Sequence, residues 1–453
     1  MTADADNLPA DVAPSRLKNF GRALASRNYR LFFIGQAVSL IGTWMTRMAS
    51  SWLVFRLAAE NANWLLGVVN FAGLAPTFFL GPIAGVFVDR WDRRRTLVVT
   101  QILSFVQSAA LAVVAFLGEP ADATVWLIAG LNLFQGVINA FDMPARQALL
   151  VEMVEKREDL PNAIALNSSL VNGSRLVGPA LSGFVIAAVG EAWCFVIDAV
   201  SYLGVIVALV AMQVAARPRT HVAASVGRHF VEGVRYAAGY PPIRALLLLI
   251  GVVSFATMPQ SVLLPVFAAE ILHGSSNTLA FLSASMGLGA LIGALYLASR
   301  STVLGLGRVI VIANLLLGVG LIGFSESTST AVSCLLLVFT GGGMMVQMAA
   351  ANTLIQTLVE EDKRGRVMSY FGMAFQGTAP FGSLLGGWLA DRYGPSAIVL
   401  GSGIMVLTAG AAFATQRSRL REHARPVLIQ RGILPDSAAG INAAAELPPI
   451  SPS

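Results

Sequence analysis

The chain has 453 residues, of which 55% are hydrophobic and only 12% are charged, and its formal net charge is +6 at pH 7. An ordinary soluble domain carries about 25% charged residues, so this little charge cannot cover a soluble surface of the same size. Apolar runs long enough to cross a hydrocarbon core of about 30 Å as a helix recur along the whole chain. The composition therefore predicts an all-α, polytopic membrane protein.

Hydropathy, read against breaks at charges, Gly and Pro, predicts twelve transmembrane helices in two groups of six. The first group is expected at 30–57, 63–88, 96–118, 124–147, 161–189 and 192–214. The second group is expected at 243–268, 277–298, 307–326, 329–353, 367–390 and 394–416.

The polar segments divide the chain into five parts. The expected parts are a cytoplasmic tail at 1–28, a six-helix bundle at 29–214, a linker at 215–242, a second bundle at 243–416 and a disordered tail at 417–453. The first tail lacks the apolar core and cleavage site of a secretory signal, so we expect it to be retained. The linker mixes basic and apolar residues in a way that suits a helix lying along the membrane surface.

Orientation follows from the basic residues, because Lys and Arg near span ends are retained in the cytoplasm. Arg47 and Arg175 lie inside spans and Arg56 and Arg392 fall on the far side, while all other Lys and Arg residues share one side with both termini. We therefore expect both termini in the cytoplasm, with the protein in the inner membrane of a bacterium. The basic residues are spread over every loop of that side, so they predict no nucleic-acid partner.

Neither the cysteines nor the histidines form a metal-binding pattern. Cys194 and Cys334 lie far apart inside predicted spans, and the four histidines lie in loops or tails. We expect no metal, no disulfide and no cofactor.

The two halves also share sequence, which predicts an internal repeat. SGFVIAAVGEAW at the end of the fifth span matches GGWLADRYGPSA at the end of the eleventh, so that Gly183 falls on Gly387. Repeats of this kind place a binding site near the midplane between halves, which then rock against one another.

The loop between spans two and three, GVFVDRWDRRRTL, resembles the signature loop of the major facilitator superfamily. In that family a Gly precedes Asp-Arg by three residues, and a second Gly follows where Asp92 stands here. Gly85 would let two helices approach closely, and Asp89 and the arginines could bind neighbouring helix ends. A positive-inside loop would explain the arginines but not the acid, so we favour a gate. The predicted gate consists of Gly85, Asp89, Arg90, Arg93 and Arg94, joined by Asp142 and Arg146 from the end of span four.

Span five contains LVGPALSGF, with Gly178, Pro179 and Gly183, which resembles the Gly-Pro motif of the superfamily's antiporters. A kinked helix interface is the structural alternative, and it is compatible with that role. Asn132 stands where the family's drug and proton antiporters often carry an Arg. From about residue 27 to 415 the chain resembles the branch that contains enterobactin exporters and macrolide efflux proteins, notably in GTWMTRMASSWLVFRLA and DMPARQALL.

Polar residues recur on one helical face of several spans, and a polar stripe facing lipid would be costly. We therefore expect these residues to line an interior pathway for substrate or protons. In the first half they are Gln36, Ser39, Thr43, Arg47 and Ser50, then Asn132, Gln135 and Asn139, then Ser168, Asn172 and Arg175. In the second half they are Gln260, Gln347, Asn352 and Gln376, among methionines and phenylalanines that suit apolar ligands or ordinary packing.

Asp198 is the one clear acid deep in a predicted span, and we expect it to pair with Arg47 or Arg175. An unpaired Arg at the centre of a span costs about 2.5–3.5 kcal/mol. A coupling site for protons and a static ion pair that fixes helix register both remain open.

These features predict a secondary active exporter of an amphipathic small molecule, either a drug-like compound or a siderophore. The resemblance implies alternating access driven by the proton gradient, in a monomer. The sequence contains no GxxxxGK[ST] phosphate loop and no catalytic constellation, which argues against an ATPase or another enzyme. Lysophospholipid or metabolite transport and a non-transporting receptor are the alternatives.

Overall fold

The computed structural model describes residues 21–58, 61–118, 122–213, 235–300, 302–361 and 363–434, and these fold into helices without a strand. The first half contains η1 (Arg22–Ala25), α2 (Arg27–Leu57), α3 (Ala62–Arg90), α4 (Arg93–Leu117), α5 (Asp122–Met153), η2 (Arg157–Asp159), α6 (Leu160–Val189) and α7 (Glu191–Ala211). The second contains α9 (Pro241–Val266), η3 (Phe267–Ile271), α10 (Ser276–Ala298), α11 (Leu306–Glu326), α12 (Thr330–Leu358), α13 (Arg364–Gln376), α14 (Ala379–Tyr393) and α15 (Pro395–Gln430).

Ten of these helices are long and apolar enough to cross a membrane, counted over the described residues. They correspond to ten of the twelve predicted spans. The other two predictions, 30–57 and 367–390, fall on α2 and on the pair α13 and α14, which are helical as expected. Helix α2 is not apolar enough to count among the ten, because it contains arginines and the polar stripe. The eleventh prediction is interrupted, so it appears as two short helices.

A proline explains the interruption between α13 and α14. Pro380 is the second residue of α14 and has no N–H to bond to the carbonyl four residues earlier. Two hydroxyl groups, one on α9 and one in the break, donate hydrogen bonds to backbone carbonyls across this contact. The Ser254 hydroxyl donates to the Phe375 carbonyl, and the Thr378 hydroxyl donates to the Gly251 carbonyl at 3.0 Å. The break is therefore held by side chains and stays closely packed against α9.

The predicted disordered tail is wrong for its first part, because α15 continues to Gln430. The extension has no Gly, and it is held to the second half by hydrogen bonds at both ends. The Tyr240 hydroxyl donates to the His423 carbonyl at 3.1 Å, and Arg431 donates to the Val359 carbonyl at 2.6 Å. Most of the predicted surface helix at 215–242, the first twenty residues and residues 435–453 lie outside the described part of the chain.

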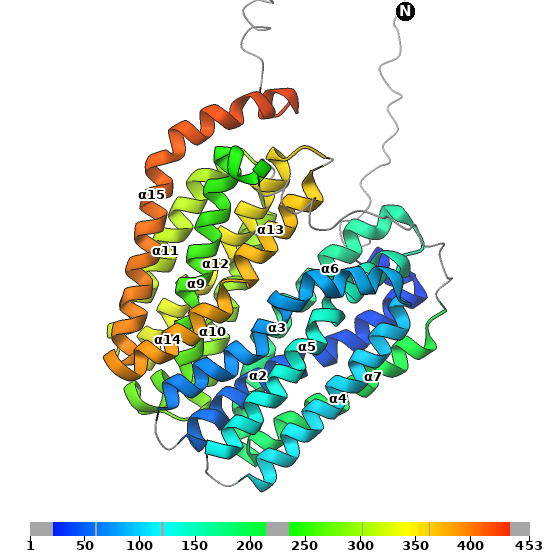
Figure 1. The fold of residues 1–453 in the computed structure, drawn as a ribbon, viewed down its shortest axis with the longest axis vertical. Coiled ribbons are helices and arrows are strands. Elements are labelled where there is room, and N and C mark those ends of the chain that lie inside the picture. Colours follow the sequence, from blue (N-terminus) through cyan, green and yellow to red (C-terminus); the bar gives the residue numbers. More distant parts are fainter. Residues whose placement is uncertain are drawn as a thin grey trace, which may run out of the picture.

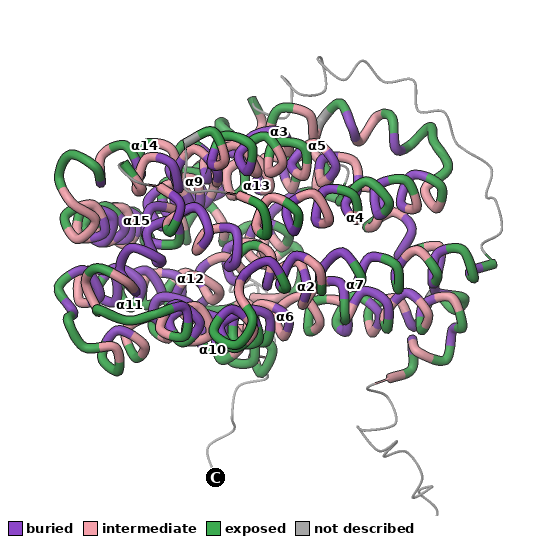
Figure 2. Tube along the Cα trace, turned by 90° about the horizontal axis from the view of Figure 1, so that it is seen from below, coloured by how far each residue is buried: buried purple, intermediate pink, exposed green. Residues whose placement is uncertain are grey.

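Figure 1 shows the two halves in contact at their lower ends and splayed apart at their upper ends. Buried and exposed residues alternate along the helices (Figure 2), as expected for helices that each turn one face to a bundle. The buried apolar residues form two clusters. The larger cluster spans both halves, whereas the smaller one contains only residues of the first half, among them Tyr29, Val88 and Met153. The two halves therefore pack together at one end only.

Two pairs of helices make most of this contact, α3 with α14 and α6 with α10. Small residues let their backbones approach closely. A Cβ atom on Gly183 would lie 2.2 Å from the Cβ of Ala280, and one on Gly387 would lie 2.4 Å from the Asn63 carbonyl oxygen. Gly183 and Gly387, which the sequence repeat aligns, thus occupy equivalent positions at the two contacts.

Replacing Gly183 by Leu is expected to open this end, because the new side chain has no room beside Ala280. Overpacking costs about 1–3 kcal/mol, which is about 5- to 150-fold in the balance between two arrangements. A cysteine placed at Ser383, which is buried at the other contact, should then react faster with a membrane-impermeant maleimide added at this end.

The labelling needs a chain whose Cys194 and Cys334 are replaced by Ala. The control is Gly130→Leu, since no atom lies within 4 Å of a Cβ at Gly130. Equal labelling rates for the Gly183→Leu variant and for this control would show that the Gly183 contact does not hold the end closed.

Candidate functional site

The predicted gate loop is held within the first half. Asp92, which replaces the family's second Gly, caps α4 by accepting a 2.8 Å hydrogen bond from the backbone N–H of Arg95. Arg93 forms an ion pair with Glu152 of α5. Arg94 donates to the Leu209 and Val210 carbonyls at the end of α7, both at 2.6 Å.

Asp89 and Arg90 remain exposed and make no hydrogen bond or ion pair with any described residue. No atom lies within 4 Å of a Cβ at Gly85, so the predicted close helix contact at Gly85 is absent from this arrangement. The reason is the separation of the halves at this end.

Asp142 and Arg146 do not join Asp89, contrary to the prediction. They pair with one another within α5, and Arg146 also donates to Gln36 of α2. The other carboxylate oxygen of Asp142 accepts 2.8 Å hydrogen bonds from Thr100 and Gln101 of α4. With both oxygens of Asp142 bonded and the residue buried, this network fixes three helices together and belongs to the scaffold.

The closed end contains a contact that the sequence analysis missed. The backbone N–H of Trp64, in the first turn of α3, donates to the Asp391 carboxylate of α14 at 3.1 Å. A carboxylate at a helix N-terminus is favourable because it accepts an unpaired N–H and complements the helix dipole. We name this contact the α14 latch, because it joins the two halves.

The signal for the α14 latch was present in the sequence. Gly387, Asp391, Arg392 and Gly394 have the spacing of the family's signature loop, including the second Gly that the loop after α3 lacks. This copy of the motif lies at the end of α14.

Asp198 is buried in α7 and does not pair with Arg47 or Arg175, so this expectation was wrong. Its Oδ2 atom accepts 2.8 Å hydrogen bonds from Thr46 of α2 and Ser108 of α4. Its Oδ1 atom is buried without a hydrogen-bond partner among the described residues. Gly42 makes room for this oxygen, since a Cβ there would lie 2.7 Å from it.

The two arginines instead meet at an aromatic ring. The guanidinium carbon of Arg47 lies 5.0 Å from the ring centroid of Trp44, and that of Arg175 lies 5.1 Å from the same centroid. Arg175 comes from α6, and Gly178 brings that helix against Trp44, because a Cβ on Gly178 would lie 2.5 Å from the Trp44 Cβ. Pro179 follows within α6 without ending the helix.

Many residues of the predicted polar pathway form hydrogen bonds inside the first half. Gln36, Ser39 and Ser50 are buried. Asn132 donates to Ser50 at 3.4 Å, and Gln135 donates to Ser104 and Asn139 at 3.2 Å. Asn172 donates to a carbonyl of its own helix, and Thr43 contacts Tyr202 at 3.4 Å. In this half the polar stripe therefore stabilises contacts between helices. Fewer of its residues can line a pathway than the sequence predicted.

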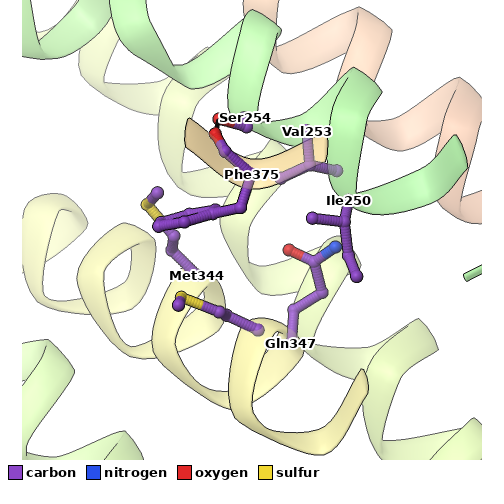
Figure 3. A pocket seen from close by; sticks show the side chains of 7 residues that line it. Ile250, Val253, Ser254, Met344, Gln347 and Phe375 are labelled. Atoms are coloured by element: carbon purple, nitrogen blue, oxygen red, sulfur yellow. Dashed lines mark hydrogen bonds between the residues drawn. The ribbon is translucent and has the colours of Figure 1, made fainter. Parts of the chain in front are cut away.

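In the second half, Gln347 lines a small internal cavity of about 10 Å³. Figure 3 shows Gln347 and Met344 of α12 facing Ile250 and Ser254 of α9 and Phe375 of α13. The Gln347 amide nitrogen is buried without a described partner. A cavity of this volume suits about one water molecule, so it cannot hold a drug-sized ligand. Gln376, at the end of α13, is exposed.

A larger groove of about 570 Å³ runs along α9, α13 and α15. Its walls are almost entirely apolar, and several of its residues, such as Leu248 and Met405, are exposed. It lies on the second half alone. Among the described residues, no group of His, Cys, Asp or Glu side chains could hold a metal ion.

Comparison with known proteins identifies the family. The model of a family described as transmembrane secretion effectors matches residues 22–437. A staphyloferrin A transporter of Staphylococcus aureus is 25% identical over 81% of this chain and 90% of its own length. Macrolide efflux protein A of Streptococcus pyogenes is 25% identical over 84% of this chain and 94% of its own length.

Among solved structures, a bacterial homologue of the human lysosomal transporter Spinster, in an inward-facing and unoccupied conformation, aligns with a TM-score of 0.65. It is 14% identical, and the alignment covers 92% of this chain and 99% of that one. At this identity the likeness concerns the fold. The chain therefore belongs to the transmembrane secretion effector family and is a multi-pass membrane transporter with the major facilitator fold, not an enzyme.

Proposed function

We propose that the protein exports an amphipathic small molecule, a drug-like compound or a siderophore, by alternating access coupled to proton entry. The observation that carries this proposal is the one-sided contact between the halves, with α3, α6, α10 and α14 packed together at one end only. With both termini in the cytoplasm, the closed end faces outward. The direction of transport is supported by relatives named for macrolide efflux.

The two Asp-Arg motifs suggest how the halves alternate. Helix α3 ends in Asp89-Arg90 and begins beside Asp391, whereas α14 ends in Asp391-Arg392. The α14 latch lies at the closed outer end, and Asp89, at the inner end, has no partner among the residues that the structure describes. When the inner end closes, Asp89 would bind the first turn of α13 as Asp391 now binds the first turn of α3. Each carboxylate then stabilises one of the two states.

Asp391→Ala is expected to favour opening of the outer end, because the first turn of α3 loses its capping acceptor. Such a cap is worth about 1 kcal/mol, so labelling of a cysteine at Ser383 from outside should rise about fivefold. Asp391→Asn keeps an oxygen acceptor and should have a smaller effect. Asp89→Ala should slow the same labelling, and a shift of both Ala variants in one direction would contradict the two-latch proposal.

Asp198 is the proposed proton site. It is a carboxyl group in the interior of α7 that has two hydroxyl donors on Oδ2, a free Oδ1 and no basic partner among the described residues. An unpaired carboxylate in the membrane interior is costly, so intramembrane acids of this kind commonly carry protons. The two hydroxyl donors remain available in either protonation state.

Asp198→Asn is expected to abolish uphill export while leaving exchange of substrate across the membrane intact, because the amide cannot release a proton. Both are measured in proteoliposomes, with and without an imposed pH gradient. Thr46→Val removes one hydrogen bond to Asp198 but keeps the carboxyl group, so it should retain coupling. Full uphill export by Asp198→Asn would rule out this residue as the proton site.

The function itself is tested in efflux-deficient cells that express the wild type or the Asp198→Asn variant, which is expected to lose uphill export. A labelled macrolide, a cationic dye and a carboxylate siderophore are compared with and without a protonophore. Lower cellular accumulation of any of them with the wild type alone, reversed by the protonophore, supports export. Transport of lysophospholipid only, or binding without transport in liposomes, would favour the alternative functions.

A further inference from the structure

Two arginines in the middle of the first half have no acidic partner among the described residues, and they converge on one tryptophan. We propose that Arg47 and Arg175, gathered on the ring of Trp44, bind an oxyanion of the transported molecule, either a carboxylate or a phosphate group. This inference rests on the proposed transport function and assigns its substrate class, an amphipathic anion.

The two arginine side chains lie side by side at the middle of their helices without a hydrogen-bond acceptor among the described residues. Arg47 lies near the middle of α2 and Arg175 near the middle of α6, with guanidinium carbons 5.0 and 5.1 Å from the same ring centroid. The six ion pairs seen among the described residues involve other groups. Neither guanidinium donates a hydrogen bond to a described residue, and the Nε atom of Arg175 is buried without an acceptor.

Asp198, which the sequence analysis expected as the partner of these arginines, has other hydrogen-bond partners. Asp198 points its bonded oxygen at Thr46 and Ser108. Arg47 is exposed although its helix packs against α5, α6 and α7. A lipid-facing Arg at this depth would be expensive, so we infer that its exposed surface faces water between the halves.

The unpaired donors indicate that the site is incomplete without an anion. The buried Nε atom of Arg175 has no acceptor among the described residues, and a cation–π contact contributes about 0.5–2 kcal/mol but supplies no hydrogen-bond acceptor. Trp44 therefore does not compensate two like charges placed on one ring. An oxyanion between them would supply the missing acceptors.

The residue types also favour an oxyanion. Guanidinium groups present a planar fork of N–H donors that binds carboxylate or phosphate in a bidentate manner. In the second half, the middle of the spans carries no charged residue, so the side chains there are mainly apolar. A molecule with an anionic head and an apolar body fits both halves.

The competing explanation is that the arginines only fix α2 against α6 through Trp44. The close backbone contact at Gly178 already holds these helices together. A packing role predicts loss of stability without a change in ligand preference. The test therefore measures binding of two dyes that share one ring system and differ in charge.

Carboxyfluorescein is the anionic probe and rhodamine 6G the cationic one, each titrated by fluorescence anisotropy into the purified full-length protein in nanodiscs. Arg47→Gln and Arg175→Gln should each weaken carboxyfluorescein binding about tenfold or more, and neither should weaken rhodamine binding. Arg47→Lys should lose less, because it keeps the charge. The control Arg419→Gln removes an exposed arginine on the extension of α15, away from the gate and from both arginines, and should change neither affinity.

Competition identifies the source of the oxyanion. Displacement of the dye by citrate indicates a soluble carboxylate, and displacement by lysophosphatidylglycerol but not by citrate indicates a lipid headgroup. Either result supports the site. A wild-type protein that binds none of the three anions, or variants that bind them as well as the wild type does, would overturn the inference.

The binding assay separates this inference from the proposed function. Binding of the anion that depends on both arginines, without transport in liposomes, would leave the site standing and refute the export. Export of rhodamine by the wild type and by both Gln variants, without binding of any anion, would refute the anion site and leave the export function standing.

Discussion

The cost of placing charged and polar groups in hydrocarbon governs this structure. Every such group inside the spans must find a partner in protein or reach water. Asp142 meets this demand with two hydrogen-bond donors and an arginine, and so ties α2, α4 and α5 together. Asp198 meets it in part, and Arg47 and Arg175 meet it only with the face of Trp44. The incompletely satisfied groups are the ones to which function is assigned.

Packing between the halves follows a different rule, since apolar surface gains little from leaving lipid for protein. Close approach of small residues replaces the hydrophobic effect. Gly183 and Gly387 provide this approach at two equivalent contacts, and the α14 latch adds one hydrogen bond. These contacts lie at one end of the molecule, so the halves can separate there while the packing within each half persists.

The proposed proton site and the proposed anion site both involve α2. Thr46 of this helix donates to Asp198, and the next residue, Arg47, lies over Trp44. Protonation of Asp198 and occupancy of the two arginines would therefore act on the same turn of one helix. Helix α2 also contacts Arg146 through Gln36, near the end where the halves separate. A single helix thus carries contacts to both proposed sites.

The sequence by itself determined the membrane class, the helical segments and the family, because apolar runs, charge placement and motif spacing are local properties. It also determined the repeat that pairs Gly183 with Gly387. Only the tertiary structure decided which partners the polar residues take: Asp198 bonds to Thr46 and Ser108, and the arginines are left on Trp44. Helical spacing shows which residues share a face, but the neighbouring helix that supplies each partner is set by packing between segments far apart in the chain.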